Sequence, residues 1–183
     1  MIEFPTGWQP NDKLLKFVND TLASGEPFAW LFVGFAGRGK TAVASLVFAE
    51  LEKQYRNSWF LSAKNVYDKY LKAINCTDTD KSVKVANAMS YFGSDLFLLD
   101  DLGRETDTPA SRAYFAGLFS DQNDAYEAGK LNRCIVTTNL VDFKEIEARY
   151  GEATMSRIYG NYIIVRFNGK QDYRMLKKQV VDV

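Results

Sequence analysis

The feature that most constrains this chain is a glycine-rich loop between an apolar run and a helical pattern. Residues 28–33 are continuously apolar, which is typical of a parallel strand covered on both faces. From Val43 to Tyr55, apolar residues recur at helical spacing. The loop between these segments has the pattern G-x-x-x-x-G-K-T and consists of Gly34, Phe35, Ala36, Gly37, Arg38, Gly39, Lys40 and Thr41.

This loop predicts a binding site for the phosphates of ATP or ADP. Its glycines let the backbone turn N–H groups toward phosphate oxygens, and the helix that follows directs its positive end at the same place. We expect Lys40 to bridge the β and γ phosphates and Thr41 to hold Mg²⁺ through its hydroxyl. A glycine turn that binds nothing is the alternative, and the strand and helix that flank the loop argue against it.

Two adjacent carboxylates follow a later apolar strand pattern. Residues 96–99 are apolar and lead directly into Asp100 and Asp101. Alone, such a pair fits a solvated turn, but beside a phosphate loop it favours Mg²⁺ binding by Asp100 and orientation of an attacking water by Asp101. Asn139 follows an apolar strand pattern at 134–138. Its amide could polarise the same water, or the residue could simply begin a turn.

Strand and helix patterns alternate along the whole chain, which predicts a doubly wound α/β domain. We expect five strands, at residues 28–33, 59–61, 96–101, 134–138 and 162–167. Thr108 and Pro109 indicate the start of a long helix, and Asp142 with Glu145 resembles a capping box. Ligands of such folds bind at the carboxyl ends of the strands, which is where the loop and the two carboxylates lie.

No linker or repeat divides the chain, so residues 1–183 are expected to form one domain with little or no separate lid. Within it we distinguish an N-terminal extension and helix at 1–27, a helical insertion at 63–92 and a C-terminal tail at 168–183. A hydrophobic content of 46% in 183 residues is sufficient for a core.

Composition excludes several kinds of chemistry. Histidine is absent, which excludes a histidine general base. The only cysteines are Cys76 and Cys134, and Cys134 lies in an apolar run and is expected to fill the core.

Lys plus Arg and Asp plus Glu are 23 each, so DNA binding would need a local basic patch. No apolar run has the length of a membrane span and no signal sequence is evident, so we expect a cytoplasmic protein without membrane contact.

Four short motifs occur in a fixed order after residue 34: the Lys40-Thr41 loop, residues 98–103, residues 136–140, and Met155-Ser156-Arg157 followed by Asp172-Tyr173-Arg174. Together they resemble the AAA+ domain of the DnaC/DnaI helicase loaders and the related IstB transposition ATPases, over residues 11–177. The resemblance implies a P-loop NTPase of AAA+ type with a five-stranded parallel sheet. It also implies head-to-tail self-association, with nucleotide held between subunits.

By the same resemblance, Asn139 takes the place of sensor 1, Arg157 that of an arginine finger and Arg174 that of sensor 2. Two departures from the family are visible. The Gly-Glu-Arg often found before the finger segment reads Gly-Glu-Ala at 151–153, and Arg149 is a candidate substitute. Family loaders carry an N-terminal helicase-binding domain, whereas 27 residues precede the first expected strand, so helicase loading itself stays open.

The family carries a helical insertion that faces single-stranded DNA, and residues 64–91 occupy its place here. Cations alternate with rings in this segment, including Tyr67, as in a surface that stacks bases and contacts phosphates. A solvated helix face would explain the same pattern. The candidate DNA-binding residues are Lys69, Tyr70, Lys72, Lys81 and Lys84.

These observations predict a DnaC-like ATPase that hydrolyses ATP, binds single-stranded DNA and assists replication, with a replicative helicase as a possible partner. Three alternatives stay open. One is an IstB-like transposition ATPase, which would need duplex DNA and a transposase. The others are a small-molecule kinase, for which no arginine-rich lid is evident, and an interaction protein that binds ATP without turnover.

Overall fold

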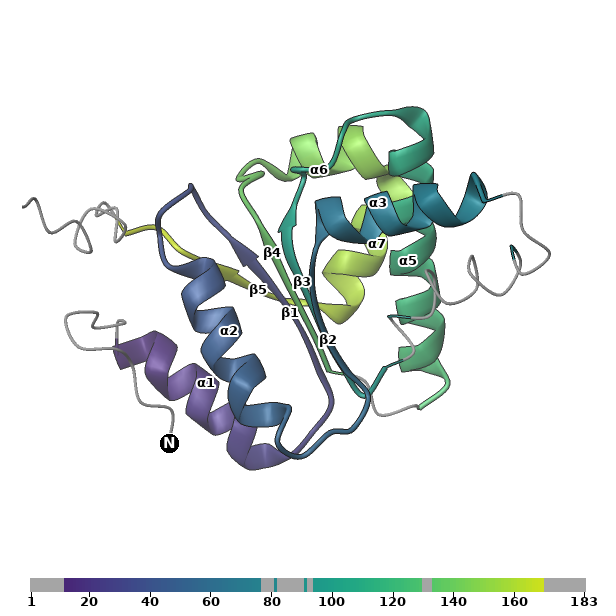
Figure 1. Cartoon of the computed structure of the whole chain (residues 1–183). Coiled ribbons are helices and arrows are strands. Elements are labelled where there is room, and N and C mark those ends of the chain that lie inside the picture. Colours follow the sequence, from purple (N-terminus) through teal and green to yellow (C-terminus); the bar gives the residue numbers. More distant parts are fainter. Residues whose placement is uncertain (1–11, 77–80, 82–90, 92–93, 130–132, 170–183) are drawn as a thin grey trace, which may run out of the picture.

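The computed structural model describes residues 12–76, 81, 91, 94–129 and 133–169. Five strands form one parallel sheet in the order β2-β3-β4-β1-β5 (Figure 1). The strands are β1 Phe28–Val33, β2 Ser58–Ser62, β3 Leu96–Leu102, β4 Arg133–Thr138 and β5 Ile163–Arg166. The predicted parallel α/β fold is confirmed, and the predicted strand boundaries differ from the observed ones by at most one residue.

Helices cover both faces of the sheet, as Figure 1 shows. On one face lie α1 Asp12–Ser24 and α2 Lys40–Leu51. On the other lie α3 Ala63–Ile74, α5 Pro109–Glu127, α6 Phe143–Tyr150 and α7 Glu152–Asn161. Of the helical insertion predicted at 63–92, residues 77–80, 82–90 and 92 lie outside the described part of the chain.

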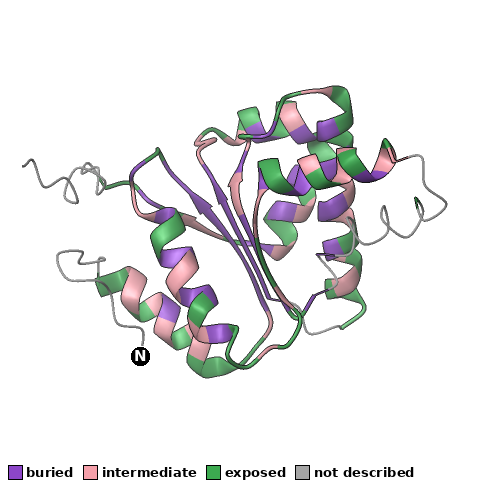
Figure 2. Ribbon diagram, in the orientation of Figure 1, coloured by how far each residue is buried: buried purple, intermediate pink, exposed green. Residues whose placement is uncertain are grey.

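Strand β1 shows why the apolar run at 28–33 is continuous. Its alternate side chains point to opposite faces, as in any strand. Ala29, Leu31 and Val33 belong to the core under α3, α5, α6 and α7, whereas Trp30 and Phe32 belong to the core under α1 and α2. Every residue of β1 is therefore buried, and the central strands form the buried layer of the molecule (Figure 2).

Local signals set the helix ends as the sequence indicates. Pro109 begins α5, and Thr108 forms a reciprocal capping box with Ser111, which confirms the predicted start of this helix. At α6 the prediction was partly wrong. Asp142 caps the helix by accepting a hydrogen bond from the Lys144 N–H, but the described hydrogen bonds do not include one from the Glu145 side chain back to Asp142.

We predict that Phe97→Ala, in the buried strand β3, lowers the free energy of unfolding by about 3–5 kcal/mol, because it leaves a cavity that the core cannot fill. Phe60→Ala is the matched control. Phe60 lies on the edge strand β2 and is 43% exposed, so its loss is expected to be clearly smaller. Urea denaturation of the two variants measures the difference, and equal losses would contradict this account of the core.

Candidate functional site

The strand order brings three segments that are distant in the sequence to one edge of the sheet. Strands β3, β4 and β1 are neighbours in the sheet and run in the same direction, so their carboxyl ends lie side by side. Gly34 follows β1, Asp100 and Asp101 lie near the end of β3, and Asn139 follows β4. The predicted phosphate loop, acid pair and amide therefore meet at the edge where folds of this class bind ligands.

The phosphate loop needs glycine at defined positions. Gly37 and Gly39 have φ values of 77° and 88°, which place both in the left-handed region, and Gly39 directly precedes α2. At Gly34 the constraint is space, because a Cβ atom there would lie 2.7 Å from the carbonyl oxygen of Phe167 after β5. These glycines let the chain turn sharply from β1 into the amino end of α2, where backbone N–H groups are available to an anion.

Lys40 ties the loop to the neighbouring strand. Its side chain is buried, and its Nζ donates hydrogen bonds to the carbonyl oxygens of Gly34 at 2.6 Å and Phe35 at 2.9 Å. Nζ also donates to Oδ1 of Asn139 at 2.8 Å. A buried ammonium group requires such acceptors. The positive charge is thus fixed inside the loop, where phosphate oxygens could act as further acceptors.

Thr41 and Asp100, the two predicted Mg²⁺ ligands, are in direct contact. The Thr41 hydroxyl donates to Oδ1 of Asp100 at 2.8 Å, and the Thr137 hydroxyl donates to the same oxygen at 2.7 Å. No group of three His, Cys, Asp or Glu side chains suited to a metal occurs among the described residues. Two oxygen donors nevertheless fit Mg²⁺, which usually binds one or two protein oxygens together with substrate phosphates and water.

Asp101 lies in an irregularity of β3 that redirects its side chain. Leu99 pairs with Val136 and Leu102 with Thr138, so β3 has an extra residue between these two pairs. Asp101 has φ 57°, an uncommon backbone conformation that Asp tolerates better than most residues. Its Oδ1 accepts a hydrogen bond from the Asn139 amide at 3.0 Å, and its Oδ2 forms an ion pair with Arg104 at 3.0 Å.

Thr137 is a site residue to which the sequence analysis gave no role. Its buried hydroxyl donates to Asp100 and accepts a hydrogen bond from the Asp101 N–H at 2.9 Å. One side chain therefore positions both acids. The signal was present in the sequence, because residues two apart on a strand share a face, and Thr137 lies two residues before Asn139.

Glu105 is a second residue that the sequence analysis missed. Its buried carboxylate accepts hydrogen bonds from the Gly103 N–H at 2.9 Å and the Tyr150 hydroxyl at 2.5 Å, and it forms an ion pair with Arg149 at 2.8 Å. Burial, together with the adjacent carboxylate, raises the pKa of Tyr150. Arg149 also donates to the Glu105 backbone oxygen. These contacts place Arg149 in an ion pair within its own chain, which argues against the suggestion that it substitutes for a second finger arginine.

Of the two arginines assigned by resemblance, the structure describes one, and that one makes no contact with the acid pair. Arg157 lies on α7 and is partly exposed, and within the described part of the chain it makes no hydrogen bond or ion pair. Arg174 lies outside the described residues. The roles of both stay predictions.

The candidate DNA-binding residues lie mainly on α3. Lys69 and Lys72 are exposed, and the Lys69 ammonium lies 5.8 Å from the ring centre of Tyr91. Tyr70 is partly buried, with its ring centre 4.4 Å from that of Tyr114. Tyr67 is buried, so its inclusion in a base-stacking surface was wrong. Lys81 is exposed, and Lys84 lies outside the described residues.

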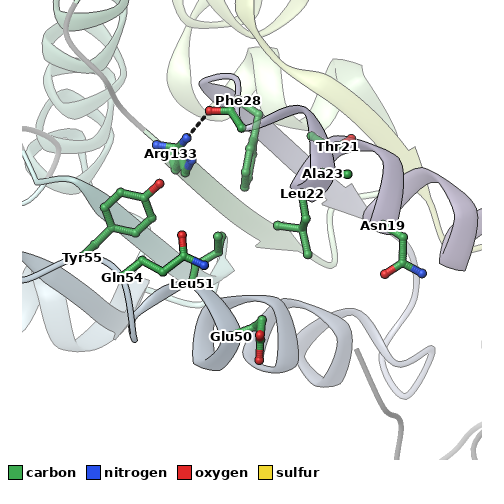
Figure 3. Close-up of a pocket in the computed structure, with 11 residues that line it drawn as sticks. Asn19, Thr21, Leu22, Ala23, Phe28, Glu50, Leu51, Gln54, Tyr55 and Arg133 are labelled. Atoms are coloured by element: carbon green, nitrogen blue, oxygen red, sulfur yellow. Dashed lines mark hydrogen bonds between the residues drawn. The ribbon is translucent and has the colours of Figure 1, made fainter. Parts of the chain in front are cut away.

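A cavity of about 430 Å³ lies at the opposite edge of the sheet, between α1, the end of α2 and the starts of β1 and β4 (Figure 3). Arg133, at the start of β4, donates to the carbonyl oxygen of Gly25 at 2.5 Å, and its guanidinium lies 4.8 Å from the ring centre of Tyr55. Arg133 therefore fastens the turn before β1. A smaller cavity of about 140 Å³ adjoins the phosphate loop at Gly34 and Phe35 and is also lined by Arg166.

Comparison with solved structures gives the fold. The crystal structure of the DnaC helicase loader superposes with a TM-score of 0.70 at 20% identity, covering 88% of this chain and 94% of that one. For DnaI the TM-score is 0.63 at 17% identity, with 89% of both chains covered. The replication initiator DnaA bound to AMPPCP and single-stranded DNA gives 0.67 at 18% identity. The chain has the fold of these AAA+ domains.

The chain spans 50% of the length of that DnaA chain, and 95% of this chain is covered by the match. A scan against protein-family models and a search of curated proteins gave no match. Within the described residues, no helix is long and apolar enough to cross a membrane.

We predict that Thr137→Val lowers the free energy of unfolding by about 1–3 kcal/mol, because valine keeps the side-chain shape but leaves the Asp101 N–H without its acceptor. Thr154→Val is the control. Thr154 is equally buried, but among the described residues its hydroxyl bonds only the Tyr150 carbonyl one helical turn earlier. Chemical denaturation should show the larger loss for Thr137→Val, and a larger loss for Thr154→Val would reject the bridging role.

Proposed function

We propose that this chain is an ATP-binding and ATP-hydrolysing AAA+ protein of the DnaC type that acts on single-stranded DNA in replication. The observation that carries the proposal is one continuous hydrogen-bonded path at the carboxyl edge of the sheet. Lys40 bonds Asn139, and Asn139 bonds Asp101. The path connects the phosphate loop with the acid pair through the strand that lies between them.

Each group in this path has a role in the proposed reaction. Loop N–H groups and Lys40 bind the nucleotide phosphates, and Asp101 orients the attacking water. Asn139 holds one oxygen of the Asp101 carboxylate and so limits its rotation. Thr41 and Asp100 would hold Mg²⁺, which neutralises phosphate charge when bound. Preorganised groups of this kind stabilise charge that develops on the transferred phosphoryl group.

The proposed site is completed by a neighbouring chain. Arg157 is partly exposed on α7 and makes no hydrogen bond or ion pair among the described residues, so its guanidinium is available to another molecule. In a head-to-tail assembly it would approach the γ-phosphate bound by the next chain, as an arginine finger does. Arg174 of the chain that binds this nucleotide would contact the same γ-phosphate.

Single-stranded DNA and a replicative helicase are the proposed partners. In the comparisons, DnaA is described as bound to single-stranded DNA and DnaC as a helicase loader. On this chain, Lys69 and Lys72 provide exposed positive charge on α3. This helix lies within the insertion that is proposed to contact DNA. The segment is proposed to contact DNA phosphates through these lysines rather than to stack bases on Tyr67.

We predict that Arg157→Ala and Asp101→Asn each lower the ATPase rate at least about 100-fold, because each removes one half of a shared site. Mixing the two variants in equal amounts should restore about a quarter of the wild-type rate, since one interface in about four then has both groups. Phosphate release measured over a protein concentration series tests this.

The control for this experiment is Arg56→Ala, an exposed arginine before β2 at the opposite edge of the sheet. It should leave the rate unchanged. Full activity of either active-site variant alone would reject the shared site. Transfer of phosphate to a small molecule instead of water would favour a kinase.

We predict that replacing Lys69 and Lys72 together by alanine weakens binding to single-stranded DNA. The slope of log K against log salt concentration should become shallower by about 1–1.5, because each DNA phosphate that the protein no longer neutralises removes roughly 0.7 from it. The control is the double variant Lys16→Ala, Lys53→Ala, whose exposed lysines lie with α1 and α2 on the other face. Fluorescence anisotropy over a salt series measures both. Equal effects of the two double variants would remove α3 from the DNA site, and tighter binding to duplex DNA would favour an IstB-like role.

A further inference from the structure

The phosphate loop carries a second cationic side chain besides Lys40, that of Arg38. Arg38 lies between Gly37 and Gly39, whose positive φ values shape the turn, and two residues before Lys40. Its Nε and Nη1 atoms are buried and have no hydrogen-bond partner. Within the described part of the chain the guanidinium also makes no ion pair. Lys40, in contrast, donates to three oxygens.

Burying unpaired N–H groups of a charged side chain destabilises the folded protein, because water is lost without a replacement acceptor. Arginine cannot relieve this by losing its proton, and all of its polar hydrogens are donors. The missing partner must therefore be an acceptor. A packing role accounts poorly for the residue, because an apolar side chain of similar length would fill the same space without the penalty.

Geometry and position indicate which acceptor fits. The third nitrogen of this guanidinium, Nη2, differs from the other two. It too makes no hydrogen bond among the described residues, but it is not buried, so it reaches the surface. Each of the two buried nitrogens shares an edge of the planar group with Nη2. An oxyanion that approaches Nη2 can therefore bond a buried nitrogen at the same time, and phosphate matches this paired geometry.

We propose that the Arg38 side chain is a second phosphate-binding cation of the loop, which bonds a phosphate oxygen of the bound nucleotide and satisfies its buried donors only when nucleotide is present. The proposal rests on the proposed function, because it requires nucleotide in this loop. It adds a consequence that nucleotide binding alone does not imply. Arg38 lowers the stability of the empty protein and raises its affinity for nucleotide.

The test uses Arg38→Met, which keeps a long apolar side chain and removes the guanidinium. Without nucleotide, the Tm of this variant should equal or exceed that of the wild type. Its Kd for ADP, measured by calorimetry with Mg²⁺, should rise about 10- to 100-fold, and the rise in Tm produced by ADP should shrink accordingly. Arg38→Lys, which keeps the charge without the planar group, should recover only part of the affinity.

Arg56→Met is the matched control, because Arg56 is exposed at the opposite edge of the sheet, and it should change neither quantity. Wild-type affinity for ADP in Arg38→Met would overturn the proposal and leave the proposed function intact. A lower Tm without nucleotide would assign Arg38 a structural role instead. Lost self-association with unchanged ADP affinity would assign its partner to a neighbouring chain. Failure of the wild-type protein to bind ADP would reject both proposals.

Discussion

The buried ammonium group of Lys40 is the interaction on which the geometry of this site depends. A buried charge must be paired, and its acceptors come from the loop itself and from Asn139 at the end of the next strand. Asn139 then bonds Asp101 one strand further on. One cation thus fixes the relative positions of three neighbouring strand ends. The sheet supplies the order of these strands, and the hydrogen bonds connect their ends into one site.

The fold was predictable because its signals are local and agree with one another. Continuous apolar runs indicated strands buried on both faces, and the structure shows two cores that share β1 by alternation of its side chains. The glycine loop could be located from the sequence because its glycines are needed for backbone conformation at Gly37 and Gly39 and for space at Gly34. Such requirements do not depend on contacts elsewhere in the chain. The burial of Cys134, expected from its apolar run, follows from the same pattern and raises its thiol pKa to about 12.

What the sequence did not reveal depends on register and on contacts between distant segments. The extra residue in β3 is visible only when β3 is paired with β4, and it determines that Asp101 bonds Asn139 and Arg104. Thr137 acquires its bridging role in the same way, since Asp100 lies on the adjacent strand. For Tyr67 the sequence indicated an exposed ring, and the structure shows a buried one. Its polar neighbours indicated a surface, but tertiary packing against Tyr114 and Phe115 buries it.

The contacts of Glu105 connect the acid pair with the part of the molecule that carries Arg157. Glu105 follows Asp101 by four residues and binds Arg149 and Tyr150 at the end of α6. Gly151 is the one residue between α6 and α7, and α7 packs against both α5 and α6. A buried ion pair of this kind is a weak source of stability, because desolvation offsets much of its attraction. Its value here lies in position, since it holds α6, and with it the start of α7, at a fixed distance from the loop after Asp101. If the proposed head-to-tail assembly forms, a chain whose Asp101 acts on its own nucleotide would therefore present its Arg157 in a defined direction to the next chain.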